Sequence, residues 1–245
     1  MSIFRKRKLL IEDFSALAVD FHNHVLPGID DGSPSKEESL KMLRKWVELG
    51  FKKIIASPHV ISALYPNTKD VILGQMHHMR EVILENDIPL EFEATAEYHL
   101  DFEFNERLER GELIPFGKKN FILVELPFQR PSYPVEEMIF SLQLAGFEPI
   151  LAHPERYTYL YSNFSEYQKM KDRGLLFQLN MNSLSGMYNL AVKKAAEKLI
   201  KNNMIEFACS DAHHAIHLHD LMKLRINKHF VDLLESGSLR NHELL

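Results

Sequence analysis

The stretch ALAVDFHNH, residues 16–24, joins a short apolar run to two histidines. A short apolar run of this kind, bounded by polar residues, predicts a buried β-strand. His22 and His24 stand two positions apart, so on an extended chain both side chains point to the same face. A His-x-His pair alone has low specificity, because a single imidazole at a strand end is usually a surface loop residue. The rest of the chain must show what this pair does.

Short apolar runs alternate along the chain with longer segments that have helical spacing. We expect seven strands, at residues 16–21, 52–57, 91–97, 121–125, 148–153, 175–180 and 205–210. We expect helices at residues 35–50, 68–86, 102–110, 134–146, 164–173 and 191–202, with a final helix beyond residue 215. Ser35 and Glu38 form the sequence of a capping box at the first helix. This alternation implies parallel strands with right-handed crossovers, and so many units favour a closed or nearly closed α/β barrel.

Composition narrows the class of protein. A chain of 245 residues is long enough for one barrel, so we expect a single domain over residues 1–245, with residues 1–15 as an N-terminal extension. The net charge of −5 argues against a nucleic-acid partner. The single cysteine, Cys209, excludes an internal disulfide and fits a reducing, cytoplasmic location. No apolar run approaches the roughly 20 residues of a membrane-spanning helix. We therefore expect at most peripheral membrane association, through the basic run RKRK at residues 5–8.

Metal-ligand side chains follow nearly every predicted strand. In chain order they are His22, His24, His59, Glu97, Glu125, His153, Asp211 and His213. The carboxyl ends of parallel barrel strands open on one face, so these residues converge. Carboxylates gathered there without Lys or Arg among them would repel one another, and divalent cations relieve that cost. Nitrogen and oxygen ligands without a thiolate suit Mn²⁺, Zn²⁺ or Fe, and their number predicts two or three ions.

Six motifs carry a resemblance to a known family. DFHNHVLPGIDDGS, ASPH, AEYH, FILVELP, LAHPERY and CSDAHH resemble motifs of the PHP (polymerase and histidinol phosphatase) superfamily. Within it they are most similar to the bacterial protein-tyrosine phosphatases of the CpsB/CapC/YwqE type. The resemblance covers about residues 18–215. It implies a distorted (β/α)7 barrel, TIM-like, with a trinuclear centre that usually holds Mn²⁺; Fe, Zn²⁺ and Mg²⁺ are the alternatives.

The resemblance also implies a ligand set, residue by residue. One ion would be held by His22, His24, Glu97 and Asp211, a second by Glu97, Glu125 and His153, and a third by Asp31, His59 and His213. Asp31 is favoured over Asp30, which would be a turn residue or lie behind the ligands. Arg156 would bind phosphate, and its planar guanidinium suits that role. Together with Asp211 and His213 it forms the expected catalytic set. Relatives often carry another arginine after the DAH motif; here Arg225 comes first, and His214 or His217 is the candidate substitute.

The expected function is a metal-dependent protein-tyrosine phosphatase. Its partner would be a phosphotyrosine-bearing bacterial tyrosine kinase of capsule or exopolysaccharide assembly. A metal-activated hydroxide would attack phosphorus, and the ions and Arg156 would stabilise the charge on the equatorial oxygens. A cysteine-based mechanism is excluded, because it needs an arginine six positions after the cysteine and Ala215 stands there. The alternatives are a small-molecule phosphatase such as histidinol phosphatase, a nucleic-acid-processing domain, and a module that only binds metal.

Overall fold

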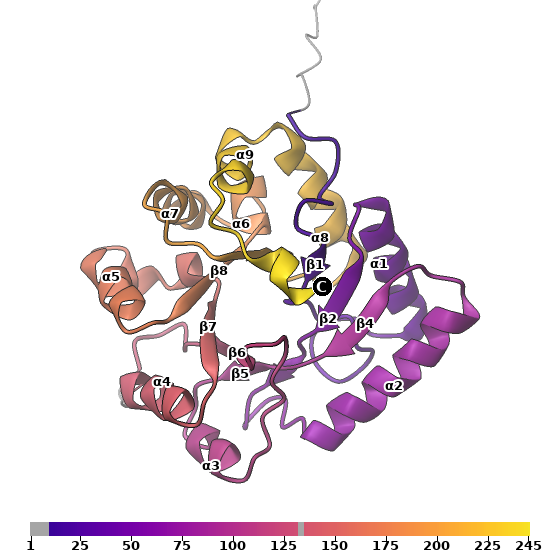
Figure 1. Cartoon of the computed structure of the whole chain (residues 1–245), viewed down its shortest axis with the longest axis horizontal. Helices are drawn as coiled ribbons and strands as arrows, with labels where there is room; N and C mark the ends of the chain where they lie inside the picture. Colours follow the sequence, from indigo (N-terminus) through magenta and orange to yellow (C-terminus); the bar gives the residue numbers. More distant parts are fainter. Residues whose placement is uncertain (1–9, 132–134) are drawn as a thin grey trace, which may run out of the picture.

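Parallel strands form a ring with helices packed around its outside (Figure 1). The structure is a computed structural model that describes residues 10–131 and 135–245. The RKRK run, and with it the predicted membrane contact, lies outside the described residues, as do residues 132–134. None of the described helices is both long enough and apolar enough to cross a membrane.

The described strands form two parallel sheets. The strands are β1 (Val19–Asp20), β2 (Lys53–Ala56), β3 (His59–Val60), β4 (Glu91–Ala94), β5 (Glu97–His99), β6 (Phe121–Glu125), β7 (Glu148–Ala152), β8 (Leu176–Asn180) and β9 (Phe207–Cys209). One sheet has the order β1-β2-β4, and the other has the order β3-β5-β6-β7-β8-β9. Each sheet is parallel throughout, as the alternating pattern predicted.

Two of the ring positions hold a bent strand. The strand predicted at residues 52–57 is β2, and a short strand that was not predicted, β3, follows it beyond the bend. The prediction of one unbroken strand was wrong for residues 91–97, which are divided between β4 and the start of β5. Pro58 lies at the first bend, where it has no N–H to offer a strand ladder. Backbone pairing continues across both bends, because Thr95 N donates to Ala56 O at 2.7 Å and Glu97 N donates to Pro58 O at 3.0 Å.

The ring closes between the first and last strands. Asn23 and Ala212 form a parallel bridge just beyond β1 and β9. His24 N donates to Ala212 O at 2.9 Å, and Asp211 N donates to His22 O at 2.8 Å. With the two bent strands each counted once, the described strands occupy seven positions of a closed ring. The predicted distorted (β/α)7 barrel is therefore confirmed.

The helices follow the predicted segments closely. They are α1 (Lys36–Glu48), α2 (Lys69–Glu85), α3 (Phe104–Glu109), α4 (Val135–Leu144), α5 (Ser165–Asp172), α6 (Asn182–Ser185), α7 (Leu190–Lys201), α8 (Ala215–Asp220) and α9 (Lys228–Glu235), with 3₁₀ turns η1 (Pro154–Arg156), η2 (Thr158–Leu160), η3 (Leu221–Ile226) and η4 (Asn241–Leu244). The predicted capping box is only half formed. Ser35 Oγ accepts a hydrogen bond from Glu38 N at 3.3 Å, but the Glu38 carboxylate accepts from Ala215 N at 3.1 Å instead of from the cap. Glu38 therefore ties the start of α1 to the start of α8.

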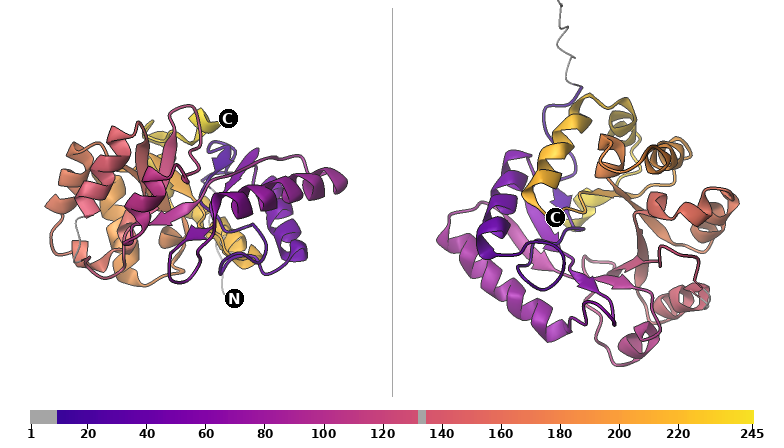
Figure 2. Two further views of the ribbon diagram at one scale, coloured as in Figure 1. Left: turned by 90° about the horizontal axis from the view of Figure 1, so that it is seen from below. Right: turned by 180° about the vertical axis from the view of Figure 1, so that it is seen from behind.

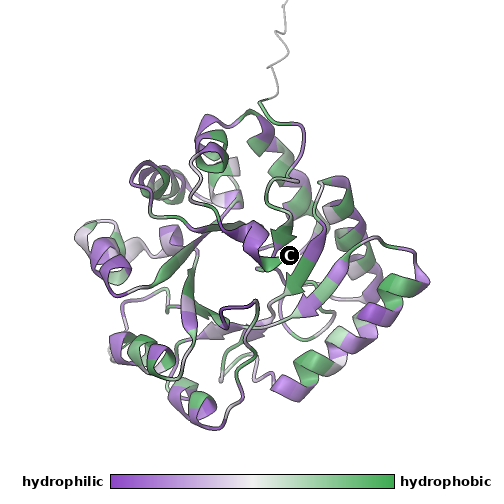
Figure 3. Ribbon diagram, in the orientation of Figure 1, coloured by the Kyte–Doolittle hydropathy of each residue, from purple (hydrophilic) through white to green (hydrophobic). Residues whose placement is uncertain are grey.

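One end of the barrel is filled and covered. Hydrophobic residues are frequent in the strands and in the helices around them (Figure 3), and the buried ones form a large core cluster. A separate cluster that includes Phe21, Ile55 and Phe207 fills the ring itself. The turn η4 lies across the end where the strands begin, and Lys53 Nζ donates to Leu244 O there at 2.9 Å. The carboxyl ends of the strands form the opposite end, which faces the reader in the right-hand view of Figure 2.

Candidate metal centre

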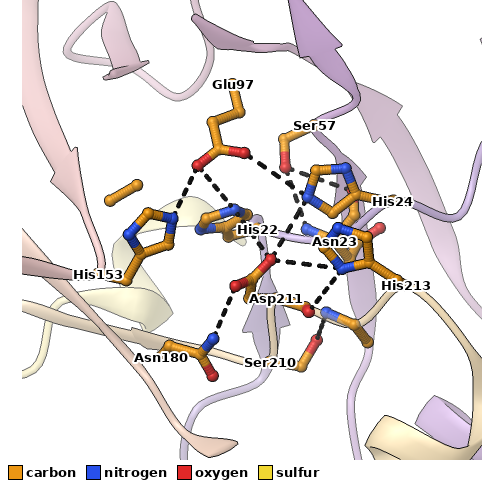
Figure 4. Close-up of polar contacts among 12 residues, drawn as sticks. His22, Asn23, His24, Ser57, Glu97, His153, Asn180, Ser210, Asp211 and His213 are labelled. Atoms are coloured by element: carbon orange, nitrogen blue, oxygen red, sulfur yellow. Dashed lines mark hydrogen bonds and ion pairs between the residues drawn. The ribbon is translucent and has the colours of Figure 1, made fainter. Parts of the chain in front are cut away.

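The predicted ligand residues converge on the carboxylate of Glu97, which is completely buried at the start of β5. Glu97 Oε1 lies 3.2 Å from His22 Nε2 and 3.1 Å from His153 Nε2, while Glu97 Oε2 lies 2.9 Å from His59 Nδ1 and 3.7 Å from His24 Nε2. Figure 4 shows the side chains of His22, His24 and His153 turned toward this carboxylate. These imidazoles come from three separate parts of the ring, so only the closed barrel assembles them.

Asp211 is the second carboxylate of the cluster, and its two oxygens have different surroundings. Oδ1 lies 3.4 Å from the Nε2 atoms of both His22 and His24. Oδ2 accepts hydrogen bonds from Arg156 Nη1 at 2.8 Å and from Asn180 Nδ2 at 2.7 Å. The donors to Oδ2 hold the carboxylate so that Oδ1 faces the two imidazoles. Asp211 has a left-handed backbone, with φ of 49°, a conformation that non-glycine residues adopt mainly under local constraint.

The outer edge of the cluster contains Asp31, His59 and His213. Asp31 Oδ1 lies 3.5 Å from the Nε2 atoms of both histidines. Its side chain is 50 % exposed, in contrast to the buried Glu97. A hydrogen bond from His213 lowers the pKa of Asp31 to about 2, so the carboxylate is charged at neutral pH. The cluster thus runs from a buried centre at Glu97 to a solvent-facing edge at Asp31.

Four groups of these residues have ligand atoms close enough to hold an ion. They are His24, Asp31, His59 and His213; His22, His24 and Asp211; His22, Glu97 and His153; and His59, Glu97 and Glu125. The first two groups overlap with two of the sets that the resemblance implies. Of the implied set of Glu97, Glu125 and His153, Glu97 and His153 fall in the third group and Glu97 and Glu125 fall in the fourth. His153 Nε2 also lies 3.5 Å from Glu125 Oε1. Every implied ligand is therefore within reach of the cluster.

Three residues behind the cluster orient the groups that face its centre. Gln178 Oε1 lies 2.7 Å from His22 Nδ1, and Asp30 Oδ2 lies 2.8 Å from His24 Nδ1. His99 Nδ1 lies 3.1 Å from Glu125 Oε2. A carbonyl or carboxylate oxygen can only accept, so Nδ1 of His22 and of His24 carries a proton, and Nε2 is the nitrogen that faces the centre. Asp30, whose role the sequence left open, is thus the acceptor behind His24.

Buried atoms without partners show that the cluster fits divalent cations. His22 Nε2, His24 Nε2 and Glu97 Oε2 are buried and make no hydrogen bond within the described residues. A buried acceptor left unpaired costs about 1–3 kcal/mol, and lone pairs that face one another need a proton or a cation between them. A proton can lie between His22 and Glu97. Burial lowers the pKa of His22, but the charge of Glu97 outweighs this effect and raises the pKa to about 9. A mixed imidazole and carboxylate set of this kind suits Mn²⁺, Zn²⁺ or Fe.

Arg156 lies beside the cluster between two aromatic rings. Its guanidinium carbon is 4.9 Å from the centre of the Phe128 ring and 5.0 Å from the centre of the Tyr188 ring. The side chain is 23 % exposed, so it reaches the open end of the barrel. The two rings and the ion pair with Asp211 hold the guanidinium in place before any ligand arrives. The structure thus places Arg156 next to the predicted metal site.

The structure also shows where His214, His217 and Arg225 lie. His217 Nδ1 accepts a hydrogen bond from His213 N at 3.2 Å, so His217 lies directly behind a predicted ligand. His214 is exposed. Arg225 Nε donates to Ile11 O at 3.4 Å, near the start of the described chain. A second arginine from this segment therefore does not join Arg156.

Sequence reasoning missed Gln178 and Asn180, which come from the one strand without a predicted ligand. Both side chains point into the open end of the barrel, where Gln178 contacts His22 and Asn180 contacts Asp211. Their two-residue spacing in LLFQLN is the same spacing that marks His22 and His24. That spacing was the signal available in the sequence, although amides are not typical metal ligands for such a cluster.

A parallel α/β barrel with a histidine and carboxylate cluster at its strand ends defines a class of metal-site barrel proteins. Within that class, the chain belongs to the capsular polysaccharide synthesis family CpsB/CapC, whose model matches residues 18–227. It is 31 % identical over 195 residues to the tyrosine-protein phosphatase YwqE of Bacillus subtilis strain 168, covering 80 % of this chain and 77 % of that protein. It is 25 % identical over 202 residues to the tyrosine-protein phosphatase CpsB of Streptococcus pneumoniae, covering 80 % and 82 %.

Solved structures show the same fold. The chain matches a structure from a crystallographic study of YwqE from Bacillus subtilis and CpsB from Streptococcus pneumoniae, described as metal-dependent tyrosine phosphatases. The TM-score is 0.75 at 28 % identity, with 87 % of this chain and 90 % of that chain covered. A histidinol phosphate phosphatase from Lactococcus lactis matches with a TM-score of 0.53 at 15 % identity, covering 86 % and 93 %, which shows a shared fold.

Replacing Asp30 with Asn is expected to weaken metal binding by about 10- to 100-fold, the usual effect of losing an acceptor behind a metal-binding histidine. Gly32 N donates to Asp30 Oδ1 at 2.9 Å, whereas His59 N, at 3.0 Å, and His24 Nδ1 share Oδ2. An Asn amide oxygen that keeps the Gly32 hydrogen bond turns its NH₂ group toward His24 Nδ1, so the acceptor behind His24 is lost. Metal content after dialysis against a weak chelator measures the effect. Asp70→Asn, at an exposed position of α2, is the control. Equal metal retention in both variants would show that Asp30 does not orient His24.

Proposed function

We propose that this chain is a metal-dependent protein-tyrosine phosphatase. Its substrate would be phosphotyrosine on a bacterial tyrosine kinase of capsule or exopolysaccharide assembly, and its compartment would be the cytoplasm. The observation that carries the proposal is the cluster around Glu97 with Arg156 beside it, because it joins cation ligands to a phosphate-binding side chain. The names of the matched relatives YwqE and CpsB support the same activity.

The proposed ligands are the nine residues that the sequence implied, namely His22, His24, Asp31, His59, Glu97, Glu125, His153, Asp211 and His213. They would hold two or three divalent ions, with Mn²⁺ as the first choice and Fe, Zn²⁺ or Mg²⁺ as alternatives. When bound, such ions lower the pKa of water toward neutrality and offset the charge of a phosphate group.

The residues of the chain supply binding and orientation. Arg156 presents a planar set of N–H donors to the phosphate oxygens while Nη1 remains against Asp211. Asn180 holds the same Asp211 oxygen, so the carboxylate stays aimed at His22 and His24 when Arg156 also binds substrate. These contacts hold charge in place before the reaction, which is how preorganised sites stabilise phosphoryl transfer.

Cys209 does not serve as a nucleophile in this proposal. It is completely buried in β9, and burial raises the pKa of its thiol well above the ordinary value. A thiol of that kind stays protonated at neutral pH, and substrate has no path to it. The phosphotyrosine chemistry is therefore assigned to the cluster at the strand ends.

The test is removal and return of metal. We expect protein stripped with a chelator to lose activity and to regain it with Mn²⁺ on a phosphotyrosine peptide, with weaker activity on histidinol phosphate and on a phosphoserine peptide. Initial rates at matched substrate concentrations measure the preference. A faster rate on histidinol phosphate would replace the proposed substrate with a small metabolite. Full activity in the stripped protein would rule out the metal-dependent mechanism.

A further inference from the structure

We propose that Phe128 is the surface on which the phenol ring of the substrate stacks, so that this side chain selects aryl phosphates over alkyl phosphates. The inference rests on the proposed phosphatase function and identifies what would make it specific for tyrosine. Phe128 stands three residues after Glu125, in the loop that follows β6. It therefore enters the open end of the barrel from the same strand that carries a proposed ligand.

The ring of Phe128 contacts neighbours at the site and is still largely exposed. It stacks on the His153 ring with centroids 6.0 Å apart and an angle of 17° between the planes. The guanidinium of Arg156 lies 4.9 Å from its centre. Even so, Phe128 is 47 % exposed. A large apolar ring is thus held in a defined orientation beside two charged or polar groups, with much of its surface left to solvent.

The length of a phosphate ester puts the aryl group of a bound substrate within reach of that ring. In phosphotyrosine a single oxygen joins phosphorus to the phenol ring, so a phosphate held by Arg156 places the phenol ring within a few ångströms of it. Phe128 is the exposed ring in contact with Arg156. Stacked or edge-to-face aromatic pairs contribute about 0.5–1.5 kcal/mol beyond the area that they bury. A serine phosphate has no ring to make this contact.

Tyr188 also contacts Arg156, but its position suits a supporting role. Its hydroxyl oxygen accepts a hydrogen bond from Asn180 Nδ2 at 3.0 Å, and the side chain is half-buried. Asn180 in turn binds Asp211, so Tyr188 belongs to the network that holds the carboxylate. Phe128 makes no such polar contact, because its side chain has no donor or acceptor.

Tyr65 is another aromatic ring at the cluster and supplies a matched comparison. It stacks on His59 with centroids 5.8 Å apart and an angle of 12° between the planes. His59 lies against Glu97 Oε2, whereas the Phe128 partner His153 lies against Glu97 Oε1. Both rings therefore stack on a proposed ligand, but Phe128 is the one against the proposed phosphate-binding arginine.

The experiment compares two non-hydrolysable probes that differ only in the ring. Benzylphosphonate and ethylphosphonate both join phosphorus to a CH₂ group, and the first then carries a phenyl ring where the second carries a methyl group. Calorimetric titration into Mn²⁺-loaded full-length protein gives the two dissociation constants for wild type, Phe128→Leu and Tyr65→Leu. Ethylphosphonate reports the phosphate site with Arg156, and the ratio of the two constants reports the ring contact.

We expect wild type to prefer benzylphosphonate, and Phe128→Leu to reduce that preference by about tenfold, near the upper limit of one aromatic contact. Tyr65→Leu should change both constants by the same factor. Equal weakening of both probes in Phe128→Leu would overturn the proposal, since Phe128 would then only steady Arg156. An unchanged preference in Phe128→Leu, or its loss in Tyr65→Leu, would also overturn it. Failure of the proposed function is seen separately, as wild type that does not hydrolyse a phosphotyrosine peptide.

Discussion

Glu97→Gln is expected to lower kcat/KM by about a thousandfold and to deplete bound metal, since each tenfold loss of rate equals about 1.4 kcal/mol and a bound cation supplies several kcal/mol of charge stabilisation. Gln has nearly the same shape as Glu, so packing in the buried site should be kept. What changes is the charge that faces four imidazoles within 3.7 Å. An uncharged amide also turns an N–H₂ group toward the centre, where it can donate to an imidazole nitrogen but repels a cation.

The measurements are metal content by elemental analysis and kcat/KM on a phosphotyrosine peptide for the same preparations. Glu91→Gln is the matched control, because Glu91 is an exposed residue at the start of β4, six positions earlier. We expect the control to keep both metal and activity. Normal activity in Glu97→Gln with depleted metal would contradict the metal mechanism, and normal metal content would remove Glu97 from the proposed ligands.

Arg156→Met is expected to leave metal content unchanged and to weaken inhibition by inorganic phosphate by about a hundredfold, the scale of losing one preorganised charged donor. Met keeps much of the apolar stem of the side chain, while the guanidinium that lies between Phe128 and Tyr188 is lost. Asp211 keeps its hydrogen bond from Asn180, so the proposed ligand cluster should stay in place.

Phosphate inhibition constants and metal content are compared with those of Arg173→Met. Arg173 is an exposed arginine paired with Glu136, far in sequence from the ligand motifs. The control should match wild type in both measurements. If Arg156→Met also bound phosphate like wild type, the proposed phosphate contact would be wrong; if it lost metal, the main role of Arg156 would be to hold Asp211.

Much of the candidate site was predictable because it depends on a repeated local pattern. His22, His24, Glu97, Glu125, His153, Asp211 and His213 all stand at or just after predicted strands. Once the strands are parallel and the ring is closed, their carboxyl ends must meet. Convergence of these side chains therefore followed from strand positions alone, without any knowledge of packing.

Contacts that depend on the exact path of the backbone were not predictable. The bends in two of the strands arise where Pro58 interrupts one ladder and the neighbouring strand follows it. Glu38 leaves its own capping box to bind Ala215, which lies 177 positions away. Phe128 and Arg156 also meet only because the loops after β6 and β7 lie side by side.

The sequence by itself determined which segments are strands and helices and which residue types end them, because hydrophobic periodicity and metal-ligand chemistry are local properties of the chain. Only the tertiary structure decided which nitrogen of each imidazole faces the centre. His22 is oriented by Gln178, 156 positions away, and His24 is oriented by Asp30 across a turn. A hydrogen bond depends on tenths of an ångström and on direction, and only the folded barrel sets these for residues so far apart in the chain.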